Sequence, residues 1–224
     1  MRCRFLYVMM VLAALPLFAA ENDSPALPET AFVARTGVRM QSHYEATYHL
    51  YEFSQQRGRW LWPDLGYYDS GKTNDQLWFA GAGGDIIRNN RVELLQIVYV
   101  EQEVGRDAHN QRAIWIWPVL DVQLTPRLSS ETVVYPTIPI DRSQRWAFDV
   151  DRSKLEYQLR RNLKAGAGYS ASVGAECDWF SKPFLTTTLT NRTGSWEFWI
   201  QRISGGAQLQ VRYTLTHTGS IFRR

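Results

Sequence analysis

The chain has 224 residues, 25 of them basic and 22 acidic, with a formal net charge of +3. This near balance of charge excludes a protein that binds nucleic acid through a strong positive field. With only two cysteines, Cys3 and Cys177, the chain has no disulfide framework and no cysteine-rich metal site.

The first twenty residues have the form of a secretory signal peptide. A short basic region at Arg2 and Arg4 is followed by the apolar residues 5–20 and then by a polar sequence from Glu21. The apolar run is shorter than the ~20 residues of a spanning helix, and a retained membrane anchor is the alternative. Cleavage removes the two arginines, leaves 23 basic beside 22 acidic residues, and leaves Cys177 without an internal partner.

Residues 21–36 are rich in Pro, Ala and acidic residues and show no period, which predicts a flexible N-terminal segment. From Val38 to about residue 51 apolar and polar residues alternate, as in a strand with one apolar face. This strand is longer than the usual five or six residues of a globular sheet. The apolar face holds Val38, Met40, Tyr44, Ala46, Tyr48 and Leu50, and the other face holds Arg39, Gln41, His43, Glu45, Thr47 and His49.

Further strands are predicted in the middle of the chain. They cover residues 75–88, 91–104, 112–124, 129–140, 145–159 and 184–190. Turn-like joints fall at 89–90, 125–127 and 161–162, whereas the connections 54–74, 105–111 and 178–183 are longer. A transmembrane barrel shows this alternation of short periplasmic turns and longer outer loops.

Residues 163–176 form a strand with one face of small residues. One parity consists of Leu163, the alanines, Tyr169 and Val173. The other consists of Lys164, the glycines, the serines and Glu176. Glycine normally weakens a strand interior, but small residues on one face suit the inside of a narrow barrel, where large side chains of other strands need space. The last two strands, 196–201 and 207–215, alternate around a Ser-Gly-Gly turn and form a hairpin. This gives ten strands. If residues 191–194 are a bulge inside one long strand, the count is nine, and an eight-stranded barrel would require one further candidate not to be a strand.

Three features depart from simple alternation. Residues 91–104 are apolar on both parities in the middle. Residues 145–159 change parity, which requires a bulge or break near 151–153. Pro118, Pro136 and Pro139 lie inside predicted strands, where they would interrupt the ladder of hydrogen bonds.

The signal peptide, the long alternating strands, the sequence at 166–171 and the amphipathic last strand together resemble small bacterial outer-membrane β-barrel proteins. The resemblance implies an all-β fold: one closed antiparallel up-and-down β-barrel of eight to ten strands in a Gram-negative outer membrane. It also implies outer-membrane lipid and the barrel-insertion machinery as partners. Members usually end on an aromatic residue, whereas Phe222 stands two positions before the C-terminal Arg224. The organisation expected is a signal peptide at 1–20, the N-terminal segment at 21–36, the barrel domain at 37–217 and a C-terminal tail at 218–224.

Tryptophans near the predicted strand ends suit the aromatic girdles of a membrane barrel. They are Trp60, Trp62, Trp78, Trp115, Trp146, Trp179 and Trp196. A soluble periplasmic barrel that binds an apolar ligand inverts the same alternation, with an apolar interior and a polar exterior, and remains an alternative. An apolar cavity would favour that binder, and a lumen packed with ion pairs would favour a structural membrane barrel.

The polar parities predict a lumen network of charged and polar side chains, with an unknown small-molecule ligand. Its predicted members are Arg39, His43, Glu45, His49, Lys164, Glu176, Glu197 and Arg212. His43, Glu45 and His49 have the chemistry for acid–base work or metal binding, but on one strand they span about 20 Å, so mutual neutralisation in the lumen is the preferred interpretation. No metal or cofactor is predicted.

Some outer-membrane barrels are lipid- or lipopolysaccharide-modifying hydrolases that use a hydroxyl nucleophile and a histidine. Candidate catalytic residues occur at Ser42-His43, at Asp107 and His109, and at Thr216-His217, but no sequence motif of those hydrolases is present. The pattern favours a non-enzymatic outer-membrane barrel, structural or with a narrow polar lumen, and leaves the hydrolase as the alternative.

Overall fold

The computed structural model describes residues 29–40, 44–70, 76–104, 111–141, 146–174, 179–203 and 206–218. Twelve strands account for nearly all of them. They are β1 Glu29–Met40, β2 Tyr44–Arg57, β3 Trp60–Asp69, β4 Gln76–Arg88, β5 Val92–Glu103, β6 Arg112–Thr125, β7 Leu128–Pro139, β8 Ala147–Arg160, β9 Leu163–Gly174, β10 Trp179–Thr190, β11 Gly194–Ile203 and β12 Gly206–Thr218. Among the described residues no helix is long and apolar enough to cross a membrane.

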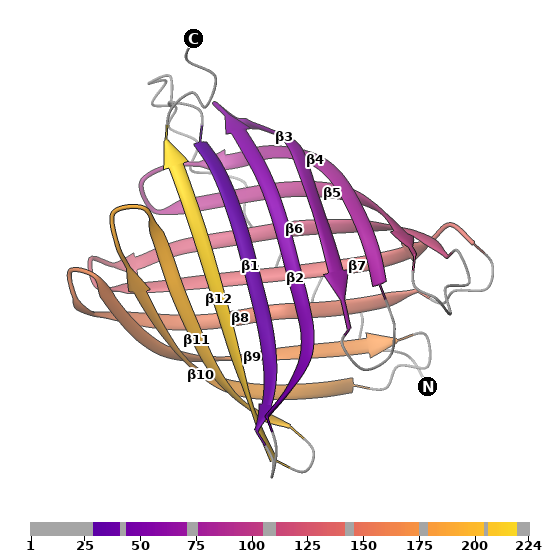
Figure 1. Ribbon diagram of the computed structural model, residues 1–224. Coiled ribbons are helices and arrows are strands. Elements are labelled where there is room, and N and C mark those ends of the chain that lie inside the picture. The colour runs from indigo at the N-terminus through magenta and orange to yellow at the C-terminus, as the bar shows by residue number, and fades with distance from the viewer. Residues whose placement is uncertain are drawn as a thin grey trace, which may run out of the picture.

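The strands form a closed antiparallel up-and-down barrel. Each strand pairs with its neighbours in the chain, and β1 pairs with β12 along its whole length, from Glu29 opposite Thr218 to Met40 opposite Ala207. Figure 1 shows β1 beside β12 at this closure. The predicted all-β, closed, up-and-down architecture is therefore confirmed.

The barrel has twelve strands, more than the eight to ten expected. One additional strand is β1, whose first eight residues lie in the segment 21–36 expected to be flexible. The other is β3, which lies inside the predicted connection 54–74. Its alternation changes parity at Trp62-Pro63, where the pairing with β4 shifts between Leu61 and Asp64. Because such a bulge interrupts the alternation of apolar and polar residues, the sequence pattern did not indicate a strand here.

The two ends of the barrel differ in their connections. Adjacent strands join through the tight turns 58–59, 89–91, 126–127, 161–162 and 191–193 at the end where β1 begins and β12 finishes. We call this the turn end. The opposite end, the loop end, is joined by residues 41–43, 70–75, 104–111, 140–146, 175–178 and 204–205. Short turns face the periplasm in membrane barrels, which assigns the loop end to the outside.

At the loop end, Asp141, which follows β7, is hydrogen bonded to Arg112 at the start of β6. Its carboxylate accepts hydrogen bonds from the backbone N–H of Arg112 at 2.7 Å and from the guanidinium of the same residue at 3.4 Å. These two donors hold the pKa of Asp141 below its usual range because they stabilise the charged carboxylate.

Large apolar side chains cover the outer face. Leu185 and Ile200, near the middle of β10 and β11, are 65% and 59% exposed. Exposed aromatic residues lie nearer the strand ends, with Trp60, Trp62, Tyr157 and Trp196 toward the turn end and Trp78 and Trp146 toward the loop end. Trp115 does not join them, because it lines a lumen cavity. An apolar band flanked by aromatic residues is the surface of a transmembrane barrel, and a soluble barrel with a polar exterior does not fit it.

Glycines make room for large rings inside the barrel, as the small-residue face predicts. A Cβ atom at Gly168 would collide with the ring of Phe184, and one at Gly66 would collide with the ring of Phe79. Both rings are buried. At Gly66 the ring of the neighbouring strand alone requires glycine, whereas at Gly168 the backbone oxygen of Ser153 would also collide with a Cβ atom.

The position of Leu185 in the lipid-facing band gives a test of this orientation. We expect Leu185→Arg to lower the free energy of unfolding by about 2–4 kcal/mol, because a cation at mid-membrane is poorly solvated. Leu189→Arg, close to the turn end of the same strand, should cost at most about 1 kcal/mol. Denaturant unfolding in lipid vesicles measures both, and equal costs for the two variants would contradict the assignment.

Candidate functional site

The lumen has two chemically different walls. One wall, on β2–β7, carries a large apolar and aromatic cluster beside the buried acids Asp64, Asp85 and Glu101. The other, on β1 and β8–β12, carries most of the bases, with acidic partners and amides. This explains why residues 91–104 are apolar on both parities: Leu95, Ile97 and Tyr99 pack inside the barrel, while Val98 and Val100 are exposed.

Aromatic rings build the apolar wall. The rings of Trp117 and Tyr135 stack with centroids 4.8 Å apart, and Tyr99 meets Phe79 edge to face at 5.3 Å. Trp117 and Tyr135 occupy a gap in the ladder, since residues 116–118 of β6 form no pairs with β7. Pro118 and Pro136 lie in this gap, where they cannot donate hydrogen bonds. The predicted interruption is confirmed for Pro118 and Pro136, but not for Pro139, which pairs with Ala113.

A β-bulge in β8 creates the centre of the charged wall. Val134 pairs with Val150 and Val133 with Arg152, so Asp151 is the additional residue in β8. The predicted bulge near 151–153 is confirmed. A bulge redirects side chains that would otherwise alternate, and here Asp151 and Arg152 both reach lumen partners: Asp151 pairs with Arg35, and Arg152 with Glu131.

Below this bulge, toward the turn end, a buried network of ion pairs crosses the lumen. We call it the belt and define it as Glu131, Asp151, Arg152, Lys154, Glu156, Glu197 and Arg212. Arg152 binds both Glu131 and Asp151. Lys154 binds Glu197, lies 3.1 Å from Glu156 and lies 3.8 Å from Glu131. A buried charge is tolerated when it is paired in this way.

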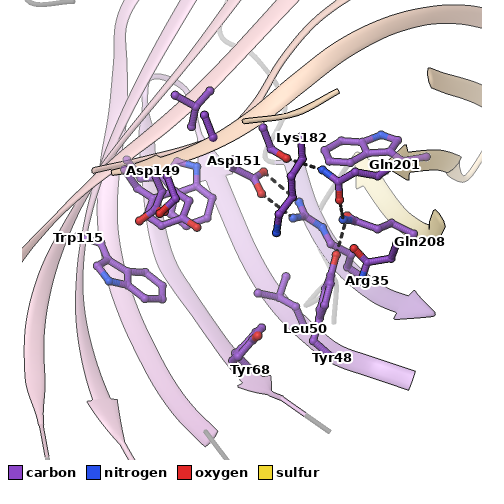
Figure 2. Close-up of a pocket in the computed structure, with 18 of the residues that line it drawn as sticks. Arg35, Tyr48, Leu50, Tyr68, Trp115, Asp149, Asp151, Lys182, Gln201 and Gln208 are labelled. Carbon is purple, nitrogen blue, oxygen red and sulfur yellow. Dashed lines mark hydrogen bonds and ion pairs between the residues drawn. The ribbon is translucent and has the colours of Figure 1, made fainter. Parts of the chain in front are cut away.

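Above the belt, the loop half of the lumen holds a cavity of about 760 Å³ that we call the vestibule. Figure 2 shows Leu50, Tyr68 and Trp115 on one side of it and Lys182 and Gln201 on another. Its lining comes from the upper halves of the strands and includes the vestibule-facing aromatic residues Tyr48, Tyr68, Trp115, Trp117, Tyr135 and Trp199.

Hydrogen bonds hold the polar side chains of the vestibule in place. Arg35 donates two hydrogen bonds to Asp151, at 2.9 and 3.3 Å, and its guanidinium lies 5.7 Å from the ring centroid of Trp199. Tyr48 donates to Gln210 at 2.6 Å, and Gln210 donates to Gln201 at 2.9 Å. These contacts fix the donors and acceptors that a ligand would meet.

The structure brings together some of the predicted network residues. Glu197 and Arg212 are opposite each other on β11 and β12, and their charged atoms are 3.9 Å apart. Lys164 is separate from them and donates to Ser129 at 3.3 Å. Arg39 and Glu45 are register partners in β1 and β2. His43 and Glu176 lie outside the described residues.

His49 does not face the lumen, contrary to the prediction. Its register partner is Thr36, which shares a hydrogen bond of 3.1 Å with its Nδ1 atom, and its ring lies near that of the exposed Tyr51. Tyr48 and Leu50, on either side of it, line the vestibule instead. The polarity of a residue does not show which way it faces here, because the side of β2 that lines the lumen is itself aromatic and apolar. Among the described residues no three His, Cys, Asp or Glu side chains form a group that could hold a metal ion.

Several central residues were missed by the sequence interpretation. Arg35 lies in the segment that shows no period. Glu131, Asp151, Arg152 and Lys154 lie in predicted strands but were not assigned to the network. A signal was present for the last three, because bulges commonly aim side chains at functional sites and Lys154 begins an alternation with the exposed Leu155 and Tyr157.

No protein-family model matches the sequence, and no curated protein matches it. Solved structures do match the fold. The KdgM porin in complex with disordered oligogalacturonate has a TM-score of 0.58 and 9% identity over 85% of this chain and 99% of that one. The NanC porin has a TM-score of 0.58 and 7% identity over 84% and 100%. An outer-membrane channel of Pseudomonas putida F1 has a TM-score of 0.54 and 11% identity over 89% and 100%.

The chain has the fold of outer-membrane porins. The barrel is closed, with every strand paired to two neighbours, and its outer face is apolar, as a membrane-spanning sheet requires. The protein is therefore an outer-membrane β-barrel with a partly polar lumen. The signal peptide lies outside the described residues and stays a prediction.

The belt can be tested through Lys154. We expect Lys154→Met to lower the free energy of unfolding by about 3–5 kcal/mol, because it leaves buried carboxylates without their cation. Lys164→Met removes the same charge from a residue that donates a hydrogen bond to Ser129 and should cost about 1 kcal/mol or less. Denaturant unfolding of refolded protein compares the two, and a loss in Lys154→Met no larger than in the control would show that the belt is not a stabilising network.

Proposed function

We propose that this protein is an outer-membrane channel that binds small oligosaccharides in its vestibule and passes them through a narrow lumen. The observation that carries the proposal is the vestibule, an open cavity of about 760 Å³ with an aromatic wall facing a wall of amides and charges. A sugar ring has an apolar C–H face and a rim of hydroxyl groups. The two walls complement these two properties of one ligand.

The vestibule offers hydroxyl groups both donors and acceptors. Gln201, Gln208 and Gln210 present side-chain amides, and Ser170 and Ser172 present hydroxyls. Amides and hydroxyls can donate and accept, as sugar hydroxyls do. Such groups favour a polar, hydroxylated solute over a purely apolar one.

The charges that line the vestibule balance. Arg35 and Lys182 stand against Asp149 and Asp151, and Arg35 is already paired with Asp151. A ligand therefore needs no net charge to be accommodated, and we expect neutral oligosaccharides to bind. The KdgM porin was solved with oligogalacturonate, which supports sugars as the solute class on this fold.

The belt makes the lumen narrow below the vestibule. Its buried side chains Arg152, Lys154, Glu156 and Glu197, with the partly buried Glu131, Asp151 and Arg212, join β7, β8, β11 and β12 across the interior. Side chains fill an eight-stranded barrel and leave a wide channel at sixteen strands, and a twelve-stranded barrel crossed by ion pairs lies between these cases. We assign the belt as the constriction of the route.

Saccharide binding can be measured as block of the ion current through single channels in planar lipid bilayers. We expect maltotriose to block the wild-type channel and Trp117→Ala to weaken its apparent Kd about tenfold, equivalent to about 1.4 kcal/mol, because the stacking surface is lost. Trp78→Ala removes an exposed tryptophan of the outer face and should leave the Kd unchanged. Absence of block in the wild type, or equal weakening in both variants, would overturn the proposal.

The constriction has its own test in the open-channel conductance. We expect Arg152→Ser to raise the conductance about twofold or more, because it removes a long side chain from the narrowest part of the route. Arg160→Ser changes an exposed residue at the turn end of the same strand and serves as the matched control. Unchanged conductance in a folded Arg152→Ser protein would show that ions do not pass the belt.

A further inference from the structure

The ladder between β10 and β11 stops before the loop end. Its last pair is Phe184 opposite Gln201. In β10 the residues above Phe184 pair only with β9, and in β11 Arg202 and Ile203 pair only with β12. Pro183, the first residue beyond the last pair, has no N–H to donate. The two strands are therefore unpaired at this point of the wall.

A groove of about 370 Å³ lies at this gap. Its lining comes from four strands and consists of Ala167, Gly168, Pro183, Phe184, Leu185, Ile200, Gln201, Arg202, Gly206 and Ala207. Small residues form much of it, and the exposed Leu185 and Ile200 form its lower part. The gap between β6 and β7 differs, because the rings of Trp117 and Tyr135 fill it.

The groove belongs to the outer, lipid-facing surface. Leu185 and Ile200 are among the most exposed apolar side chains of the barrel. Toward the lumen the groove ends at Gln201, which is buried and hydrogen bonded to Ser170 and to Gln210. Gln201 lines both the groove and the vestibule and, with the buried Phe184, separates them, so the occupant enters from the membrane.

Arg202 places a cation at the loop side of this apolar groove. Its side chain is exposed, and among the described residues it has neither a hydrogen-bond nor an ion-pair partner. The loop end faces outward, so Arg202 lies toward the headgroups of the outer leaflet. Guanidinium groups bind phosphate through charge-assisted paired hydrogen bonds. An apolar hollow that leads to such a cation complements a phosphorylated lipid.

We propose that the groove between β10 and β11 binds one acyl chain of a phosphorylated outer-leaflet glycolipid, with its phosphate on Arg202. This site is separate from the vestibule and does not depend on saccharide transport. It requires only the membrane orientation established above.

The test quantifies phosphorylated glycolipid that copurifies with the full-length protein from outer membranes in mild detergent, by extraction and mass spectrometry. We expect the wild type to retain glycolipid and two variants to lose it about fivefold or more: Ala167→Leu, which fills the groove, and Arg202→Gln, which removes the phosphate partner. Ala82→Leu, at an exposed alanine of β4, and Arg160→Gln at the turn end are matched controls and should retain it.

Each other outcome has a defined meaning. Equal glycolipid in the wild type and in Ala167→Leu would overturn the groove as the acyl site. Loss in Arg202→Gln alone would indicate a headgroup bound at the surface without a seated chain, and recovery of phospholipid in place of glycolipid would overturn the proposed occupant. Heat-dependent gel mobility identifies the folded barrel in every variant, so loss of lipid is not confused with loss of fold.

Discussion

Closure of the sheet between β1 and β12 is the constraint on which the remaining structure depends. In the membrane each backbone N–H and C=O group needs a partner, and the register from Glu29 opposite Thr218 to Met40 opposite Ala207 supplies these partners along the whole seam. With the ends joined, the chain can tolerate local departures elsewhere. The two gaps, at Pro118 and Pro136 and above Phe184, occur at prolines or next to one.

The bulge in β8 turns this scaffold into a divided lumen. By adding Asp151 to the strand, it allows two successive side chains, an acid and a base, to find partners inside the barrel. Asp151 pairs with Arg35 at the floor of the vestibule, and Arg152 pairs with Glu131 in the belt. One inserted residue therefore links the binding cavity to the network beneath it, since both depend on the same backbone geometry.

The sequence predicted the features that period and turn chemistry control. Alternation, tight turns and the small-residue face at Gly166 and Gly168 led to the closed barrel, and the parity change at 151–153 located the bulge. The same rule failed wherever a lumen wall is apolar, because hydrophobicity no longer separates inside from outside. His49 was assigned to the lumen for this reason, and Leu50, which lines it, was assigned to the lipid. β3 was missed because Trp62-Pro63 breaks its alternation.

Contacts between distant strands were beyond any local pattern. Arg35 and Asp151 are 116 positions apart in the chain and meet only because β1 and β8 face each other across the closed barrel. Lys154 and Glu197, 43 positions apart, meet for the same reason. A sequence pattern assigns a residue to a face of the sheet, but the diameter and register of the barrel decide which charged residues become partners.

The two levels of the lumen divide the work of the proposed channel. In the belt Arg152 and Lys154 are already bound to carboxylates, so exchanging these partners for a passing solute would gain little free energy. The belt therefore selects mainly by size. In the vestibule, ring faces stand open beside amides, and a sugar can bind there without breaking an ion pair. The vestibule therefore selects a solute by its chemistry, and the belt then selects it by size. The solute can still be released, because the ion pairs of Arg152 and Lys154 are formed before it arrives.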